Sequence, residues 1–142
     1  MRNSYDFTTG LRDDKFTFSS TGPKGEISKG VIFEMEDDGL YSVIMGDLDE
    51  NGELKPLQPT GNGDAKKVLA TVADIIEYFV ERKPKAVIFM TGITDQLTSI
   101  YKQLLLHELN LPSYDMEGLN ADNTSEPIDP NKDYEGFFVF RK

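Results

Sequence analysis

The stretch DAKKVLATVADIIEYFVERKP, residues 64–84, decides the fold. Its apolar residues recur every three or four positions, which is the spacing of one face of an α-helix. These residues are Ala65, Val68, Leu69, Val72, Ile75, Ile76, Phe79 and Val80. Asp64 occupies the position where a carboxylate can cap a helix, and Pro84 cannot continue one. The sequence therefore predicts an amphipathic helix from about residue 65 to about residue 82.

Three strand patterns precede this helix, in which apolar and polar residues alternate. They cover residues 15–20, 27–36 and 40–48. In the second of them Val31, Phe33 and Met35 share one face. Gly-Pro-Lys-Gly at residues 22–25 and Asp-Asp-Gly at 37–39 are typical of tight turns between strands. We therefore predict an antiparallel three-stranded meander, followed by a polar loop over residues 49–63.

The second half alternates strands and helices. An unbroken apolar run at residues 86–90 predicts a strand covered on both faces. Thr94 or Asp95 then caps a second helix that extends to about Asn110. The pattern predicts a short strand within the loop of residues 113–133, near 114–119, and an aromatic strand at 134–141.

This order predicts an α+β two-layer sandwich. An N-terminal antiparallel three-stranded meander is followed by α-β-α-β, with two helices packed on one face of a mixed sheet. No linker divides the chain, so we expect a single domain over residues 1–142. Residues 1–14 are expected to form an extended or mobile arm.

Composition excludes several classes of function. The formal net charge is −10, and acidic residues concentrate in residues 34–53 and 108–135. This excess disfavours direct binding of nucleic acid. The chain has no cysteine and one histidine, which excludes disulfides, thiolate metal sites and multi-histidine zinc sites. No nucleophile motif accompanies His107, so the sequence assigns no catalytic residue.

A calcium site is one candidate. Residues 47–52 match the opening of a calcium-binding loop, in which oxygen ligands alternate and glycine stands sixth. The ligands would be Asp47, Asp49, Asn51 and Glu53. The ninth and twelfth positions, Lys55 and Gln58, depart from the pattern, and a β-turn explains the same residues. Calcium is the one cofactor that the sequence leaves open.

An anion site is a second candidate. Thr91, Gly92 and Thr94 follow the apolar strand and open a helix, where α/β proteins often bind ligands. Hydroxyl groups and the helix N-terminus could receive an anion there. No lysine or arginine lies in the segment, so helix capping is the competing interpretation.

The acidic residues of the second strand and its turn are a candidate interaction surface. They are Glu34, Glu36, Asp37 and Asp38. Such a surface could meet a basic partner or imitate the phosphates of DNA. Ordinary solubility charge is the competing interpretation.

The chain resembles a family of small uncharacterised α+β proteins of bacteria and tailed bacteriophages. Four pieces carry the resemblance: VLATV at 68–72, Pro84, VIF at 87–89 and Ile100-Tyr101. The similar proteins often carry arginine just before the last pair, where this chain has Thr98 and Ser99. The resemblance implies the fold and a bacterial or phage origin, and it implies no activity.

The function expected from these features is that of a non-catalytic protein-interaction protein, as a phage or mobile-element accessory or virion component. One alternative is an acidic DNA mimic that inhibits a DNA-binding protein. The other is a small metal- or anion-binding enzyme with its site near residues 47–52 or 91–95. We expect a protein partner, leave a homo-oligomer open, and expect no contact with a membrane. Residues 1–11 lack the apolar core of a signal peptide, so we expect the host cytoplasm or a virion.

Overall fold

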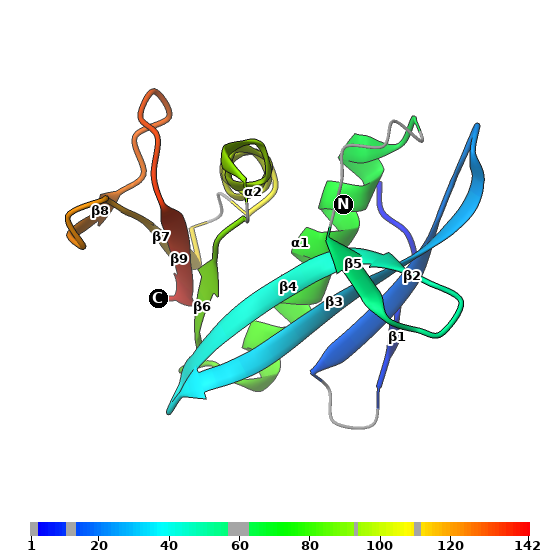
Figure 1. The fold of residues 1–142 in the computed structure, drawn as a ribbon. Coiled ribbons are helices and arrows are strands. Elements are labelled where there is room, and N and C mark those ends of the chain that lie inside the picture. Colours follow the sequence, from blue (N-terminus) through cyan, green and yellow to red (C-terminus); the bar gives the residue numbers. More distant parts are fainter. Residues whose placement is uncertain (1–2, 11–13, 57–62, 93, 110–111) are drawn as a thin grey trace. The chain divides into compact units, whose positions relative to one another are not determined.

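A computed structural model describes residues 3–10, 14–56, 63–92, 94–109 and 112–142 (Figure 1). The helices are α1 (Ala65–Arg82) and α2 (Asp95–His107). The strands are β1 (Thr8–Thr9), β2 (Lys15–Gly22), β3 (Gly25–Asp37), β4 (Leu40–Leu48), β5 (Leu54–Pro56), β6 (Val87–Met90), β7 (Tyr114–Leu119), β8 (Ser125–Pro127) and β9 (Gly136–Arg141).

The strands form a mixed sheet in the order β1-β2-β3-β4-β6-β9-β7-β8, with β5 paired to β4. Strand β4 pairs with β6 in parallel, whereas β6 with β9 and β9 with β7 are antiparallel. Strand β2 pairs with β3 antiparallel, from Lys15↔Ile32 to Gly22↔Gly25. The predicted α+β class, with an N-terminal meander and a mixed, largely antiparallel sheet, is confirmed.

The differences from the predicted elements are local. Strands β1, β5 and β8 have two or three residues each, and their sequences carry no alternating pattern. They exist because a neighbouring strand supplies partners for their backbone groups. Helix α2 ends at His107 and not near Asn110, with Glu108 as its C-cap. The next N–H, that of Leu109, donates to the carbonyl of Leu104 at 3.2 Å and not to that of Leu105, so the helical pattern of hydrogen bonds stops there.

The chain forms two compact units, which we describe separately. The first comprises Met1–Glu34 and Ile44–Phe79, and the second comprises Met35–Val43 and Val80–Lys142. In the first unit, aromatic rings join α1 to the sheet. Phe33 of β3 stacks on Phe79 of α1 with ring centroids 3.9 Å apart, and Phe16 of β2 meets both Phe33 and Tyr78 edge-on.

The phenylalanine rings of β2 and β3 belong to the hydrophobic core. Phe16, Phe18 and Phe33 are at most 6% exposed, so a nucleic-acid base could not stack on their faces. The predicted apolar face of α1 is also buried at its centre, where Val72, Ile75 and Ile76 lie.

The second unit has its own core. It consists of apolar side chains from β6, β9 and α2, all fully buried: Ile88, Met90, Leu104, Leu105, Phe137 and Val139. Thr94 caps α2 as predicted, because its hydroxyl accepts the N–H of Leu97 at 3.1 Å. In the described ranges, neither helix is long and apolar enough to cross a membrane.

Asp64 lies just before α1, as predicted, but its carboxylate has a different role from the one expected. The carbonyl of Asp64 accepts the N–H of Val68 at 2.9 Å. Its carboxylate accepts the hydroxyls of Tyr5, at 2.6 Å, and Ser20. Burial acts to raise the pKa of Asp64, but the hydrogen bonds from Ser20 and Tyr5 outweigh it and the pKa is lowered. The carboxylate thus ties the N-terminal segment and β2 to the start of α1.

Candidate functional site

The end of the β3–β4 hairpin carries the predicted interaction residues. We call residues 34–38 the acidic tip. The side chains of Glu34, Glu36, Asp37 and Asp38 are all exposed. Met35 between them is 63% exposed, the largest exposure of any big apolar side chain in the described ranges. Figure 1 shows β3 and β4 as two long neighbouring strands that meet at this turn.

Met35 departs from the sequence pattern. Alternation places it on the face of Val31 and Phe33, which are 0% and 3% exposed. The hydrophobic core therefore covers this face as far as Phe33, and β3 continues beyond it. An exposed methionine flanked by acids is the result.

Within the described ranges, the charges of the acidic tip lack ion-pair partners. Among the residues that the structure describes, none of its four carboxylates forms a salt bridge with a lysine or arginine. The carboxylate of Asp37 accepts the backbone N–H of Asp38 at 2.8 Å, which shapes the turn. The tip is therefore a local concentration of exposed negative charge.

Strand β3 is longer than its partner β2 at this end. Their pairing starts at Lys15↔Ile32, and the N–H of Phe33 donates to the carbonyl of Asp14 at 2.8 Å. Beyond that bond β3 extends to Asp37. In the described ranges, the pairing of β3 with β2 does not extend to residues 34–37.

Of the predicted calcium ligands, Asp47 lies in β4 and the other three lie in the turn between β4 and β5. Asp47 forms an ion pair with Lys29, which is buried. Asp49 accepts the N–H groups of Asn51 and Glu53 at 2.9 Å each. The hydrogen bond from Glu53 is the main cause that lowers the pKa of Asp49. The geometry is that of the competing β-turn, and calcium binding stays a prediction.

For metals in general, the described residues contain no group of three or more His, Asp or Glu side chains placed to hold an ion.

The predicted anion ligands Thr91, Gly92 and Thr94 lie between β6 and α2, and their polar groups form hydrogen bonds within the protein. Thr91 donates to the carbonyl of Glu135 at 2.8 Å, and the N–H of Gly92 donates to the hydroxyl of Thr98 at 3.2 Å. A Cβ at Gly92 would lie 2.5 Å from that of Leu97, so the backbone is closely packed. The interpretation as a helix cap accounts for these contacts, and anion binding stays a prediction.

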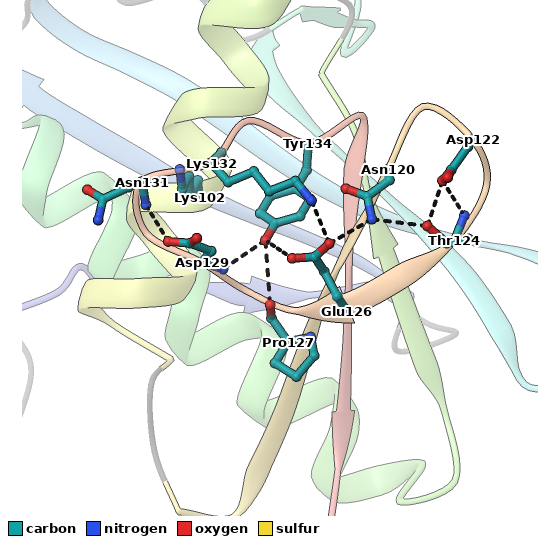
Figure 2. A network of polar contacts seen from close by, with 10 residues as sticks. All are labelled: Lys102, Asn120, Asp122, Thr124, Glu126, Pro127, Asp129, Asn131, Lys132 and Tyr134. Carbon is teal, nitrogen blue, oxygen red and sulfur yellow. Dashed lines mark hydrogen bonds and ion pairs between the residues drawn. The ribbon is translucent and has the colours of Figure 1, made fainter.

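A polar network in the second unit was not predicted (Figure 2). Its centre is Tyr134, which is 8% exposed. The Tyr134 hydroxyl accepts the N–H of Asp129 at 2.8 Å and donates to Glu126 at 3.1 Å. Glu126 also accepts Lys132 at 2.6 Å and Asn120 at 2.8 Å. The network orders the loops on both sides of β8.

Charge interactions in this network shift two pKa values in opposite directions. The hydrogen bond from Lys132, followed by that from Asn120, lowers the pKa of Glu126. The same bond from Glu126 raises the pKa of Lys132. Both charged forms are therefore favoured by folding.

The Glu126–Lys132 pair is expected to make stability depend on pH in acid. Because the folded pKa of Glu126 lies below its unfolded value of about 4.3, the stabilisation is present above pH 4.3 and is lost as the pH falls through the folded pKa. We expect Glu126→Gln to lower the melting temperature at pH 6 and to have little effect at pH 3. Circular dichroism melts of both proteins from pH 3 to 7 measure this. A difference that stays constant with pH would mean that the pair contributes no stability.

A hollow of about 240 Å³ lies beside this network in the second unit. Residues of α2, of the loop between β7 and β8, and of β9 and the segment before it line the hollow: Asp95, Thr98, Ser99, Lys102, Ala121, Asp133, Tyr134, Glu135 and Phe137. The lining combines hydroxyl, carboxylate and ammonium groups, and Lys102 donates to the carbonyl of Lys132. No spacing in the sequence indicated this hollow, because its residues come together only when α2 packs beside β9.

Comparison with known proteins places the whole chain in one family. A model described as a family of unknown function (DUF6934) matches residues 1–142. No curated protein and no solved structure matches the chain.

Proposed function

Because the chain belongs to the family of unknown function DUF6934, we propose a function from its own surface. It is a non-catalytic protein-interaction protein that binds a basic partner through the acidic tip. One observation carries the proposal: Met35 stands 63% exposed among four exposed carboxylates that form no salt bridge in the described ranges.

Two physical properties of the tip support this function. The carboxylates, on a chain of net charge −10, attract a basic partner and speed its association. Met35 supplies apolar area that gains free energy when a partner removes it from water. Methionine is also enriched in the cores of protein interfaces. The charges thus select the partner, and Met35 helps to hold it.

The experiment is affinity capture from lysate of the source organism at two salt concentrations. The test variant neutralises the tip with Glu34→Gln, Glu36→Gln, Asp37→Asn and Asp38→Asn. The control neutralises four exposed acids elsewhere, with Glu26→Gln, Glu50→Gln, Glu53→Gln and Glu81→Gln. Both variants have a net charge of −10 + 4 = −6. Any difference between them therefore reports where the charge lies.

We expect the wild type and the control to capture one stoichiometric basic protein, and the neutral-tip variant to lose at least tenfold in affinity. Raising the salt from 50 to 500 mM should weaken capture, because it screens exposed charges. Equal capture by the two variants would contradict the proposal. If the captured protein binds DNA, and if added DNA releases it from this chain, then the chain acts as an acidic DNA mimic, which is one form of the same function.

We also propose a bacterial or phage origin and a location in the host cytoplasm or a virion. The resemblance to small proteins of bacteria and tailed bacteriophages supports the origin. An accessory or virion component with a basic protein partner fits both locations. Detection of the chain in purified particles by mass spectrometry would distinguish the two.

A further inference from the structure

We propose that Met35 is a site of reversible oxidation, where a neutral hydroperoxide converts the thioether to a sulfoxide and thereby releases the partner. The oxidation is independent of the proposed function, whereas the release of a basic partner rests on it. The proposal adds a modification site to the acidic tip, together with a way to switch its binding off.

Exposure distinguishes Met35 from the other methionines of the described ranges. Met35 is 63% exposed, whereas Met45 and Met90 are 3% and 0% exposed. Met116 is half-buried. An oxidant in water must reach the sulfur atom, so a buried methionine reacts only when the protein opens locally. Of these four methionines, we expect Met35 to react first.

The sulfoxide of Met35 is compatible with the folded protein. The core on this face of β3 ends at Phe33, which is 3% exposed, and Met35 lies beyond it. The added oxygen therefore stays in water and keeps its hydrogen bonds. At Met45 or Met90 the same oxygen would enter the core. Oxidation of Met35 is thus expected to leave the melting temperature within a few degrees of its starting value.

The charges of the acidic tip select the kind of oxidant. Four exposed carboxylates flank Met35 and form no salt bridge in the part of the chain that the structure describes. They repel an anionic oxidant such as peroxymonosulfate, and salt screens this repulsion. Hydrogen peroxide is neutral at pH 7 and is not repelled. The tip therefore favours hydroperoxides over oxidants that carry a negative charge.

The reaction is a two-electron transfer of one oxygen atom. A lone pair of the sulfur attacks one oxygen of hydrogen peroxide, so that an S–O bond forms and the O–O bond breaks. The sulfur is oxidised by two electrons and the peroxide is reduced. The second oxygen leaves as hydroxide and takes up the proton of the first, which releases one water. Methionine sulfoxide reductases reverse the oxidation.

Oxidation changes the apolar part of the tip and leaves its charges in place. Methionine gains free energy when a partner removes it from water, whereas a sulfoxide loses hydrogen bonds to water when it is buried. The loss of this one contact is expected to weaken binding about tenfold. The carboxylates are unchanged, so the residual binding should keep its dependence on salt.

Peptide mass spectrometry after treatment with hydrogen peroxide locates the oxidation. In the folded full chain, Met35 should gain one oxygen at least about tenfold faster than Met45 and Met90, because those two require local opening. In urea the three rates should converge. Equal rates at the three methionines in the folded chain would overturn the proposal.

The neutral-tip variant tests the choice of oxidant. Peroxymonosulfate should oxidise Met35 faster in this variant than in the wild type, because the repelling charges are gone. Hydrogen peroxide should oxidise Met35 at the same rate in both proteins. A peroxymonosulfate rate that is equal in both would contradict the selection of neutral hydroperoxides.

The probe for release is an acetylated and amidated peptide of three Lys-Val repeats. A peptide of three Lys-Ser repeats is the control, with the same charge and little apolar area. In titration calorimetry, peroxide treatment should weaken binding of the Lys-Val peptide about tenfold and leave that of the Lys-Ser peptide nearly unchanged. A sulfoxide reductase should restore the first affinity. Met35→Leu lacks the thioether, so its own affinity should be the same before and after peroxide.

The outcomes separate this inference from the proposed function. Oxidation at Met35 with equal peptide affinity before and after treatment would overturn the release and leave the acidic surface intact. A loss of affinity in Met35→Leu after peroxide would assign the effect to another residue, which also overturns the release. If the untreated wild type binds neither peptide, the proposed function and the release both fail, and the mass spectra still decide whether Met35 is the oxidation site.

Discussion

Replacing Ile76 with aspartate is expected to unfold the protein. Ile76 lies at the centre of α1 and is 0% exposed, on the buried face that includes Val72 and Phe79. A carboxylate at this position would be desolvated without a charged partner, which costs several kcal/mol, and the apolar contacts of isoleucine would be lost as well. Because domains are stable by about 5–15 kcal/mol, this one substitution removes most or all of the stability.

Far-UV circular dichroism and urea titration of Ile76→Asp measure this effect. Ile76→Val is the size control and should cost about 1 kcal/mol, since it removes one buried methylene. Glu81→Ala, at an exposed position of the same helix, should change stability by less than about 0.5 kcal/mol. A cooperative Ile76→Asp transition with the wild-type midpoint would show that this face of α1 is not buried.

Gly118→Ala is expected to have the second largest effect. A Cβ at Gly118 would lie 2.4, 2.5 and 2.6 Å from three ring atoms of Tyr134. The ring has little freedom to move, because Asp129 and Glu126 hold its hydroxyl and Phe137 meets its plane edge-on. The added methyl group therefore forces either the ring or β7 to shift, at a cost of about 1–3 kcal/mol.

A double-mutant cycle tests this cause. In the background of Tyr134→Ala the ring is absent, so Gly118→Ala should then cost less than about 0.5 kcal/mol. Stability is measured by urea titration of the wild type, both single variants and the double variant. Equal costs in both backgrounds would assign the effect to the backbone of β7 and not to the ring.

The candidate interaction site could be predicted in part. Its acidic residues stand in an alternating strand pattern before a tight turn, and the sequence therefore placed Glu34 and Glu36 on the surface. It placed Met35 with Val31 and Phe33 on an apolar face, and that pattern could not show where the core ends.

The Tyr134 network shows a different limit. Gly118, Glu126 and Tyr134 are individually unremarkable in the sequence. They meet because β8 pairs with β7 and because the loop after β8 returns over Gly118. Hydrogen bonds between such separated residues leave no periodic signal.

The sequence by itself determined the features that rest on neighbouring residues. These are the amphipathic α1, the Thr94 cap of α2 and the turn after β3, where Gly39 has φ of +77°. Each follows from periodicity, capping or backbone freedom within a few residues. Only the tertiary structure decided the parallel pairing of β4 with β6, the short strands β5 and β8, and the exposure of Met35. These features depend on which distant segments supply hydrogen-bond partners and apolar cover, and such partners are chosen by the packing of the whole chain.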